Sequence, residues 1–124
     1  MPYVDGFVIA VPTANKLAYV DMAKAVGKRF IEFGATRLVE CWGEDVPDGK
    51  LTDFKRAVQA KVDETVVFAW IEWPDKTTRE AGHARMHAAM EADEFGTGAP
   101  PFDGNRMIFG GFETILRLED QARA

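Results

Sequence analysis

A near-absence of cysteine is the first feature of this sequence. Cys41 is the only cysteine among 124 residues, so the chain cannot form an internal disulfide, and nothing in it indicates an oxidising compartment. Because lone cysteines are among the most frequently buried residues, we predict that Cys41 is a small apolar side chain of the core.

Apolar runs long enough to cross a membrane are also missing, and the first residues lack a basic, signal-like segment. Lys and Arg number 15 against 20 Asp and Glu, the formal net charge is -5, and the basic residues form no stripe. A nucleic acid or an acidic membrane surface would select for such a stripe. The sequence therefore predicts a soluble cytoplasmic protein that binds neither membranes nor nucleic acid.

Strand and helix patterns alternate along the chain. Runs of β-branched and aromatic residues predict strands at 3–11, 36–43, 65–73 and 105–116. Apolar residues at three- and four-residue spacing predict helices over about 15–34 and 77–93. Asn15 and a Thr77-x-x-Glu80 capping box mark the helix starts, and Gly34 marks the end of the first helix.

The segment between the second and third strands is less regular. A Pro-Asp-Gly turn predicts a surface excursion after the second strand. Residues 54–64 fit either a helical period or the first arm of a hairpin, and the hairpin is favoured. The order is thus β-α-β, an excursion, then β-α-β. It predicts a single α+β domain over residues 1–124, with a four-stranded antiparallel sheet and both helices on one face, the ferredoxin-like arrangement.

The strands are apolar on both faces. In the third strand, Val67, Ala69 and Ile71 alternate with Phe68 and Trp70. Two helices cover only one face of a four-stranded sheet, so the other face would remain an apolar surface. We therefore expect a homodimer in which two sheets pack face to face as a dimeric α/β barrel.

Four runs carry a resemblance to a known family: YVDGFVIAVP, LVECWGEDVPDGKLTDF, ETVVFAWIEWP and PFDGNRMIFGGF. Over nearly the whole chain, the sequence resembles the YbaA-like family of small uncharacterised bacterial proteins, which is placed among the dimeric α/β-barrel folds. The last run departs from the family pattern at Pro100, Asn105 and Phe109, where the family has Met, Lys and Tyr. The resemblance implies the fold and the dimer, and it implies no reaction.

The run PFDGNRMIFGGF also contains candidate ligand-binding residues. Gly110 and Gly111 lie where a strand normally has bulk, which indicates a bulge, a close neighbour or room for a ligand. Asp103 and the following glycine predict a turn into the strand. Arg106 is expected either to pair with Glu40 or Glu72, or to bind an acidic group of a ligand.

Two glutamates lie in aromatic strands and are the candidate catalytic residues. Glu40 lies near Trp42, and Glu72 lies between Trp70 and another tryptophan, so Trp42 and Trp70 are candidate ligand-binding residues. In a poorly solvated cavity, such a carboxyl would have a raised pKa and would suit general acid or base catalysis. The alternative is a paired, structural glutamate.

Histidines are few, and they predict no metal site. His83 and His87 lie four residues apart on the second helix, but no further ligand completes a zinc set. Haem-degrading proteins of the superfamily hold haem with a histidine on the second helix, a tryptophan on the third strand and an asparagine on the first. This chain has Asp5 in place of the asparagine, so we expect no haem and no other cofactor.

Three classes of function fit these observations. The first is a cofactor-independent enzyme, similar to an oxygenase or an isomerase, that uses an aromatic cavity of the barrel. The second is a protein that binds a small molecule, and the third is a structural or interaction dimer without catalysis. A cavity with convergent polar groups would distinguish the first from the others.

Overall fold

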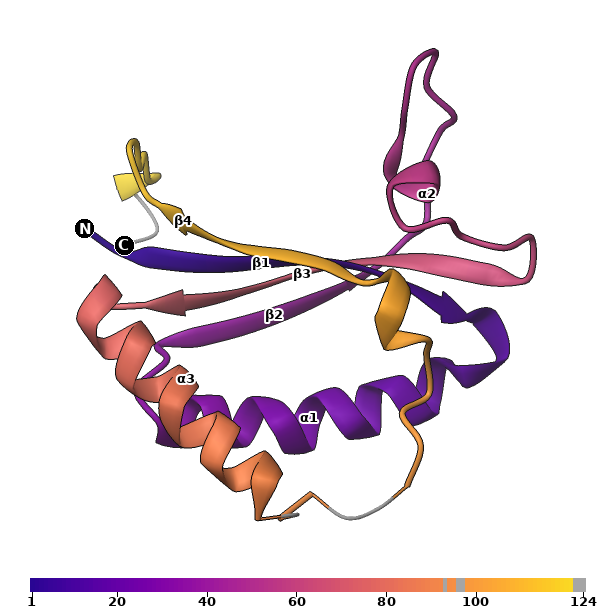
Figure 1. Ribbon diagram of the computed structural model, residues 1–124. Helices are drawn as coiled ribbons and strands as arrows, with labels where there is room; N and C mark the ends of the chain where they lie inside the picture. Colours follow the sequence, from indigo (N-terminus) through magenta and orange to yellow (C-terminus); the bar gives the residue numbers. More distant parts are fainter. Residues whose placement is uncertain (93, 96–97, 122–124) are drawn as a thin grey trace.

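The computed structural model describes residues 1–92, 94–95 and 98–121, and its elements follow the predicted order (Figure 1). They are β1 (Tyr3–Pro12), η1 (Thr13–Asn15), α1 (Lys16–Glu32), β2 (Arg37–Trp42), α2 (Phe54–Ala57), β3 (Glu64–Trp73), α3 (Lys76–Glu91), η2 (Gly104–Arg106) and β4 (Ile108–Glu113). No helix in the described part of the chain is both long and apolar enough to span a membrane.

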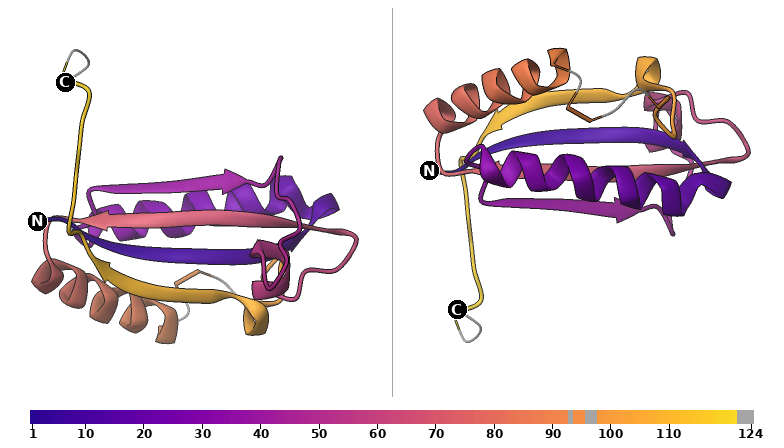
Figure 2. Two further views of the ribbon diagram at one scale, coloured as in Figure 1. Left: turned by 90° about the horizontal axis from the view of Figure 1, so that it is seen from above. Right: turned by 90° about the horizontal axis from the view of Figure 1, so that it is seen from below.

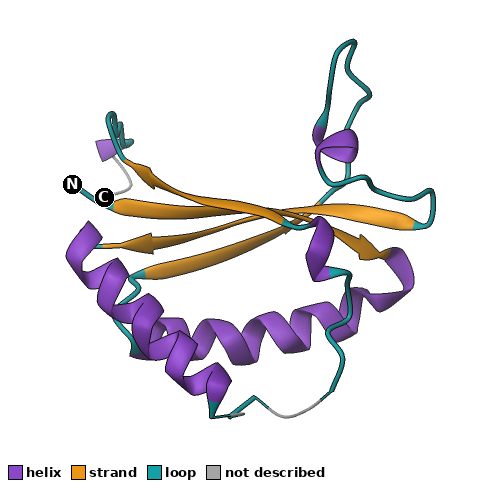
Figure 3. Cartoon of the chain, viewed as in Figure 1, coloured by secondary structure: helices purple, strands orange, loops and turns teal. Residues whose placement is uncertain are grey.

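The four strands form one antiparallel sheet in the order β2-β3-β1-β4. The strands lie in one layer with the two long helices below it (Figure 3). In the views from above and below, α1 lies under the middle of the sheet and α3 lies along the β4 edge (Figure 2). Both long helices lie on one side of the sheet, which confirms the predicted ferredoxin-like α+β fold. The central strands β1 and β3 pair over their full length, from Tyr3 opposite Trp73 to Pro12 opposite Glu64.

The core lies between the sheet and the two long helices. Alternate residues of β1 and β3 pack against Tyr19 and Ala23 of α1, and Phe33, which follows α1, packs against Met86 and Ala89 of α3. The buried strand side chains on this face are Ile9, Val11, Val67, Ala69, Ile71 and Trp73. Gly82 of α3 allows close approach, because a Cβ there would lie 2.4 Å from the Trp73 ring. We call this side of the sheet the covered face.

The opposite side, which we call the open face, carries no long helix. Only one end of it is covered, where Val58 of the excursion packs on Ala10 and Val66. In Figure 1 the excursion and the segment after β4 both rise from this side of the sheet. The remainder of the open face lies bare in the single chain.

Several local predictions are wrong. Residues 54–64 form no hairpin arm: a single helical turn, α2, precedes a turn into β3, because Asp53 caps that helical turn by accepting a hydrogen bond from the Arg56 amide. The last strand is shorter than predicted, since η2 occupies its expected beginning. Cys41 is exposed, because it lies on the open face of the edge strand β2, opposite Phe68.

The helix ends also differ in part from the prediction. The cap of α3 is Asp75, whose side chain accepts a hydrogen bond from the Thr78 amide, so the predicted capping box is wrong. Asn15 precedes α1 as expected, but its side chain donates to the Pro101 carbonyl instead of capping the helix. Gly34 follows α1 with φ at 115°, in the left-handed region that favours glycine, as predicted.

Candidate functional site

The open face forms a broad apolar groove of about 640 Å³ across β3, β1 and β4. Phe68 contacts Trp70 edge-on at a centroid distance of 5.8 Å, and Phe54 of α2 contacts Phe68 in the same way at 5.9 Å. Phe112 is 60% exposed. The side chains on this face are almost all apolar, so the face is suited to burial against another apolar surface.

Glu72 is the charged residue of this groove, and it is already paired. Its Oε2 accepts hydrogen bonds from Arg37 Nε at 2.7 Å and from the Trp70 indole N–H at 2.9 Å. Burial alone would raise the pKa of Glu72, but the bonds from Trp70 and Arg37 outweigh it and lower the pKa. The carboxylate is therefore held as a paired anion and is poorly suited to accept a proton.

Glu40 and Trp42 lie on the covered face, so the structure does not bring them together with Glu72 and Trp70. The Tyr19 hydroxyl donates to Glu40 Oε1 at 2.6 Å, and Lys16 lies over the Trp42 ring. Burial raises the pKa of Glu40, and the bond from Tyr19 offsets part of that effect. The pKa rise expected for a strand glutamate thus occurs at Glu40 and not at Glu72.

Arg106 pairs with neither Glu40 nor Glu72, so that prediction is wrong. Its Nη1 and Nη2 donate to the two carboxylate oxygens of Glu64 at 2.7 and 2.6 Å, and Nε donates to Asp103 at 3.1 Å. The Arg106 hydrogen bonds hold the pKa of Glu64 at about 2. With its guanidinium occupied, Arg106 ties η2 to the start of β3 instead of presenting a free cation. Asp103 caps η2 by accepting from the Asn105 amide.

Gly110 and Gly111 point to opposite faces of β4. A Cβ on Gly110 would meet the Phe112 ring on the open face at 3.4 Å, which is ordinary contact. A Cβ on Gly111 would lie 2.8 Å from Arg79 Nη2 and 2.9 Å from the Tyr3 hydroxyl on the covered face. Close neighbours of the same chain thus account for Gly111.

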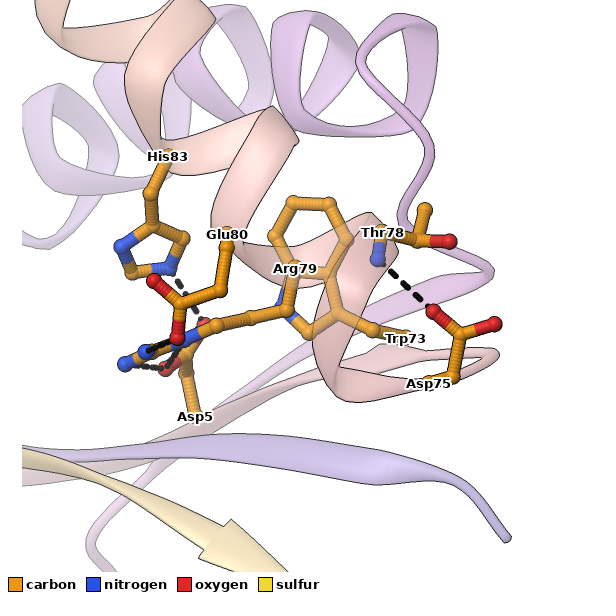
Figure 4. A network of polar contacts seen from close by, with 7 residues as sticks. All are labelled: Asp5, Trp73, Asp75, Thr78, Arg79, Glu80 and His83. Carbon is orange, nitrogen blue, oxygen red and sulfur yellow. Dashed lines mark hydrogen bonds and ion pairs between the residues drawn. The ribbon is translucent and has the colours of Figure 1, made fainter.

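A polar cluster that the sequence did not predict lies on the covered face, around Asp5 of β1 (Figure 4). Asp5 is 2% exposed and is the one charged or polar residue that is buried among the described residues. Its Oδ2 accepts from the Trp73 indole N–H at 2.8 Å and contacts His83 Nε2 at 2.7 Å. Its Oδ1 accepts from Arg79 Nε at 3.0 Å and Nη2 at 2.8 Å.

The charges of this cluster are arranged around the buried carboxylate. The Asp5 carboxylate holds the pKa of Arg79 above its usual value, and Glu80 adds a smaller effect in the same direction. Arg79 also lies over the Tyr3 ring, 5.3 Å from its centroid. Asp5 is thus a buried carboxylate paired with one cation, Arg79, and with two further side chains, Trp73 and His83.

The two histidines have different surroundings. His83 points toward the sheet and contacts Asp5, whereas His87 is 77% exposed and contacts Glu91 at 3.0 Å, one turn along α3. Within the described ranges, no three His, Cys, Asp or Glu side chains gather as a metal site would require. The absence of a metal and of any other cofactor stays a prediction.

The structure brings Asp5, Trp73 and His83 together, one of the combinations of first-strand, third-strand and second-helix positions that the sequence left open. One signal was available in the sequence. Asp5 shares the period of two with Phe7, Ile9 and Val11, so its side chain belongs to the face that the helices bury. A carboxylate in that position requires a partner, and Arg79 and His83 occur one turn apart on the second predicted helix.

A second apolar groove, of about 550 Å³, lies between α1 and α3, and we call it the helix groove. Its described lining carries no charged side chain: Ala18, Met22, Val26, Phe30, Met86, Met90, Phe95, Gly98, Ala99, Pro100 and Pro101. Phe30 connects this groove to the polar cluster, since its ring lies 6.2 Å from the His83 ring and 6.0 Å from the Trp73 ring.

The sheet topology and the two packed helices define a ferredoxin-like protein, and solved structures agree. The chain is similar to a dimeric ferredoxin-like protein from an uncultured marine organism, with a TM-score of 0.56 over 97% of this chain and 100% of that one, at 12% identity. A protein of unknown function from Nitrosomonas europaea is similar with a TM-score of 0.50 over 96% and 94% of the two chains, at 11% identity. At these identities the likeness shows the fold.

The chain belongs to the family described as "Protein of unknown function (DUF1428)", whose model matches residues 2–104. Its relatives include the uncharacterized protein YbaA of Escherichia coli K12 and of Shigella flexneri. Each is 55% identical over 116 residues, which cover 94% of this chain and 98% of the relative. The resemblance seen in the four sequence runs is therefore confirmed. None of these descriptions names a reaction or a ligand.

Proposed function

We propose that this chain works as a homodimer whose two sheets pack through their open faces. The observation that carries the proposal is the apolar groove across β3, β1 and β4, which no long helix covers. The excursion and the segment after β4 rise on either side of this face, and they expose Leu51, Ile115 and Leu118. A second copy seated between them would cover these side chains and the groove together. The structurally similar protein from an uncultured marine organism is described as dimeric, which supports a dimer for this chain.

Sedimentation velocity of the full chain tests the dimer. At micromolar concentration we expect a dimer for the wild type and a monomer for Phe112→Glu, because a carboxylate on the open face would be buried without a partner. Leu17→Glu is the matched control, since Leu17 is 79% exposed on the outer side of α1. A monomeric wild type, or a Phe112→Glu variant that dimerises like the control, would contradict the proposal.

We further propose that the dimer binds an uncharged, mainly apolar small molecule in the helix groove of each subunit. The volume of about 550 Å³ lies within the usual range for ligand sites, and the described lining offers no charge to pair with a ligand ion. The open face is less suitable, because the partner sheet would occupy it and its one carboxylate is already paired.

Binding of N-phenyl-1-naphthylamine, an uncharged fluorescent probe of apolar sites, tests the helix groove. We expect saturable binding to the wild type and at least tenfold weaker binding to Met90→Trp, whose larger side chain would fill the groove. Leu17→Trp adds the same side chain outside the groove and should bind the probe like the wild type. A protein that dimerises but binds no probe would support the structural class of function instead.

A further inference from the structure

The hydrogen bond between Asp5 and His83 determines which imidazole nitrogen carries a proton. Asp5 Oδ2 also accepts from the Trp73 indole, and Oδ1 accepts from Arg79. A carboxylate that accepts from these donors has no proton to give, so His83 Nε2 must donate across the 2.7 Å contact. In the neutral imidazole, Nδ1 then has a free lone pair.

The orientation of the ring is fixed by its neighbours. Trp73 and Phe30 lie against the His83 ring with centroid distances of 5.7 and 6.2 Å. The buried Asp5 holds Nε2, and in Figure 4 the second ring nitrogen points away from the carboxylate. Within the described part of the chain, no hydrogen bond to Nδ1 is formed.

The His83 side chain is 38% exposed, whereas the Asp5 side chain is 3% exposed. The carboxylate is thus closed off behind the imidazole, and only the imidazole is open to a ligand. Phe30 separates His83 from the helix groove, and Met86, one turn along α3 from His83, lines that groove. His83 is not among the described residues that line the groove, so a ligand there would have to pass the Phe30 ring to reach the imidazole.

From this geometry we propose that His83 is a catalytic base. Resting on the proposed ligand site, it takes a proton through Nδ1 from an apolar compound that bears an enolisable C–H or a phenolic O–H. Asp5 is the positioning residue that holds the tautomer, and Arg79 and Trp73 hold Asp5 in turn. A buried carboxylate that orients an imidazole is an arrangement in which histidine acts as a general base, and the groove lies on the other side of Phe30.

The chemistry balances without any further reactant. The C–H or O–H bond of the substrate breaks, its proton forms an N–H bond at His83 Nδ1, and the electron pair stays on the substrate as an enolate or phenolate. When the deprotonated substrate is a conjugated dienolate, return of the same proton to its other nucleophilic carbon completes an isomerisation. No oxidant or reductant is consumed in this proton transfer.

The tautomer of His83 is measurable without any ligand. In ¹⁵N-labelled wild-type protein at a pH where the ring is neutral, long-range ¹H–¹⁵N correlation should show Nε2 protonated and Nδ1 unprotonated. A neutral ring protonated at Nδ1 would overturn the proposal. Asp5→Asn should reverse the tautomer if the variant folds, because the asparagine amide donates to Nε2 in place of the accepting carboxylate.

Proton abstraction is measurable with 5-nitrobenzisoxazole, an uncharged aromatic probe. A base removes its ring C–H proton, the electron pair completes a nitrile, the N–O bond breaks, and a coloured nitrophenolate forms. We expect the wild type to accelerate this elimination and His83→Gln to lose at least tenfold in kcat/KM. Glutamine retains a donor to Asp5 but is not a base. His87→Gln is the matched control and should match the wild type, since His87 also contacts a carboxylate but lies in solvent.

The two proposals fail in different ways. If 5-nitrobenzisoxazole displaces N-phenyl-1-naphthylamine but His83→Gln and the wild type react at the same rate, the ligand site in the helix groove is supported and the catalytic role of His83 is overturned. If neither probe binds, the ligand site itself is wrong, and the proton-transfer proposal is overturned with it. Circular dichroism and a melting curve of His83→Gln establish that a loss of rate is measured on folded protein.

Discussion

The two faces of the sheet consist of alternate residues of the same strands, yet they differ in chemistry. Asp5 on the covered face is buried among an arginine, a histidine and a tryptophan. Glu72, opposite Val4 on the open face, pairs with the exposed Arg37 and the indole of Trp70. The covered face therefore combines a core with a closed polar cluster, whereas the groove of the open face is apolar, with Glu72 as the one carboxylate of its described lining.

This difference assigns separate tasks to the two faces. An apolar face without unpaired polar groups is suited to packing on a second copy, because burying it leaves no donor or acceptor without a partner. A buried carboxylate is costly unless donors surround it, so its presence on the covered face requires a specific arrangement of helix α3. Under our proposals, association uses the open face and proton transfer uses the covered face.

Removal of each carboxylate should show the largest difference between the faces. We expect Asp5→Ala to lower the free energy of unfolding by about 3–5 kcal/mol, because Arg79 would remain as a partly buried cation without its partner. Glu72→Ala should cost less than about 1 kcal/mol, as expected for a pair with an exposed arginine. Urea unfolding of both variants at neutral pH measures these changes. Equal losses of unfolding free energy would contradict the difference expected between the two carboxylates.

The two adjacent glycines of β4 give a smaller contrast. Gly111→Val should lower the free energy of unfolding by about 1–3 kcal/mol, because its Cβ would overlap Arg79 and Tyr3 on the covered face. Gly110→Val meets only ordinary contact with Phe112, so it should leave the unfolding of the isolated chain nearly unchanged and weaken the dimer. Thermal unfolding measures the loss of stability, and sedimentation measures the loss of dimer. If Gly110→Val destabilised the chain and Gly111→Val weakened only the dimer, the faces given to the two glycines would be wrong.

The pair at the edge of the sheet should produce the smallest effect, which depends on pH. Glu64 has a pKa of about 2 in the folded chain, below its value of about 4.3 when unfolded. Its stabilising contribution is therefore present above pH of about 4 and is lost as pH falls toward 2. We expect Glu64→Gln to cost about 1–2 kcal/mol at pH 7 and much less at pH 2.5. Urea unfolding at both values tests this, and a constant difference would exclude the pair as its cause.

The sequence predicted the order and type of the main elements because these depend on residues that are close in the chain. Alternating apolar residues in β1 and β3 and the stripe of α1 are local patterns, and the structure retains them. The wrong predictions concern element ends and short segments, because there a single side-chain hydrogen bond determines which local structure forms. Asp75 replaces the predicted capping box, and Asp53 stabilises a helical turn where a hairpin was expected.

By itself, then, the sequence determined a ferredoxin-like fold with two apolar sheet faces, because a period of two along each strand sets which residues share a face. Only the tertiary structure decided which charged residues meet. Asp5 and His83 are 78 residues apart, and Arg106 and Glu64 are 42 apart. Their contacts depend on the strand order, on the placement of α3 along the β4 edge and on the path of the excursion. No local pattern contains that information, because each contact joins side chains whose distance is set by the packing of whole elements.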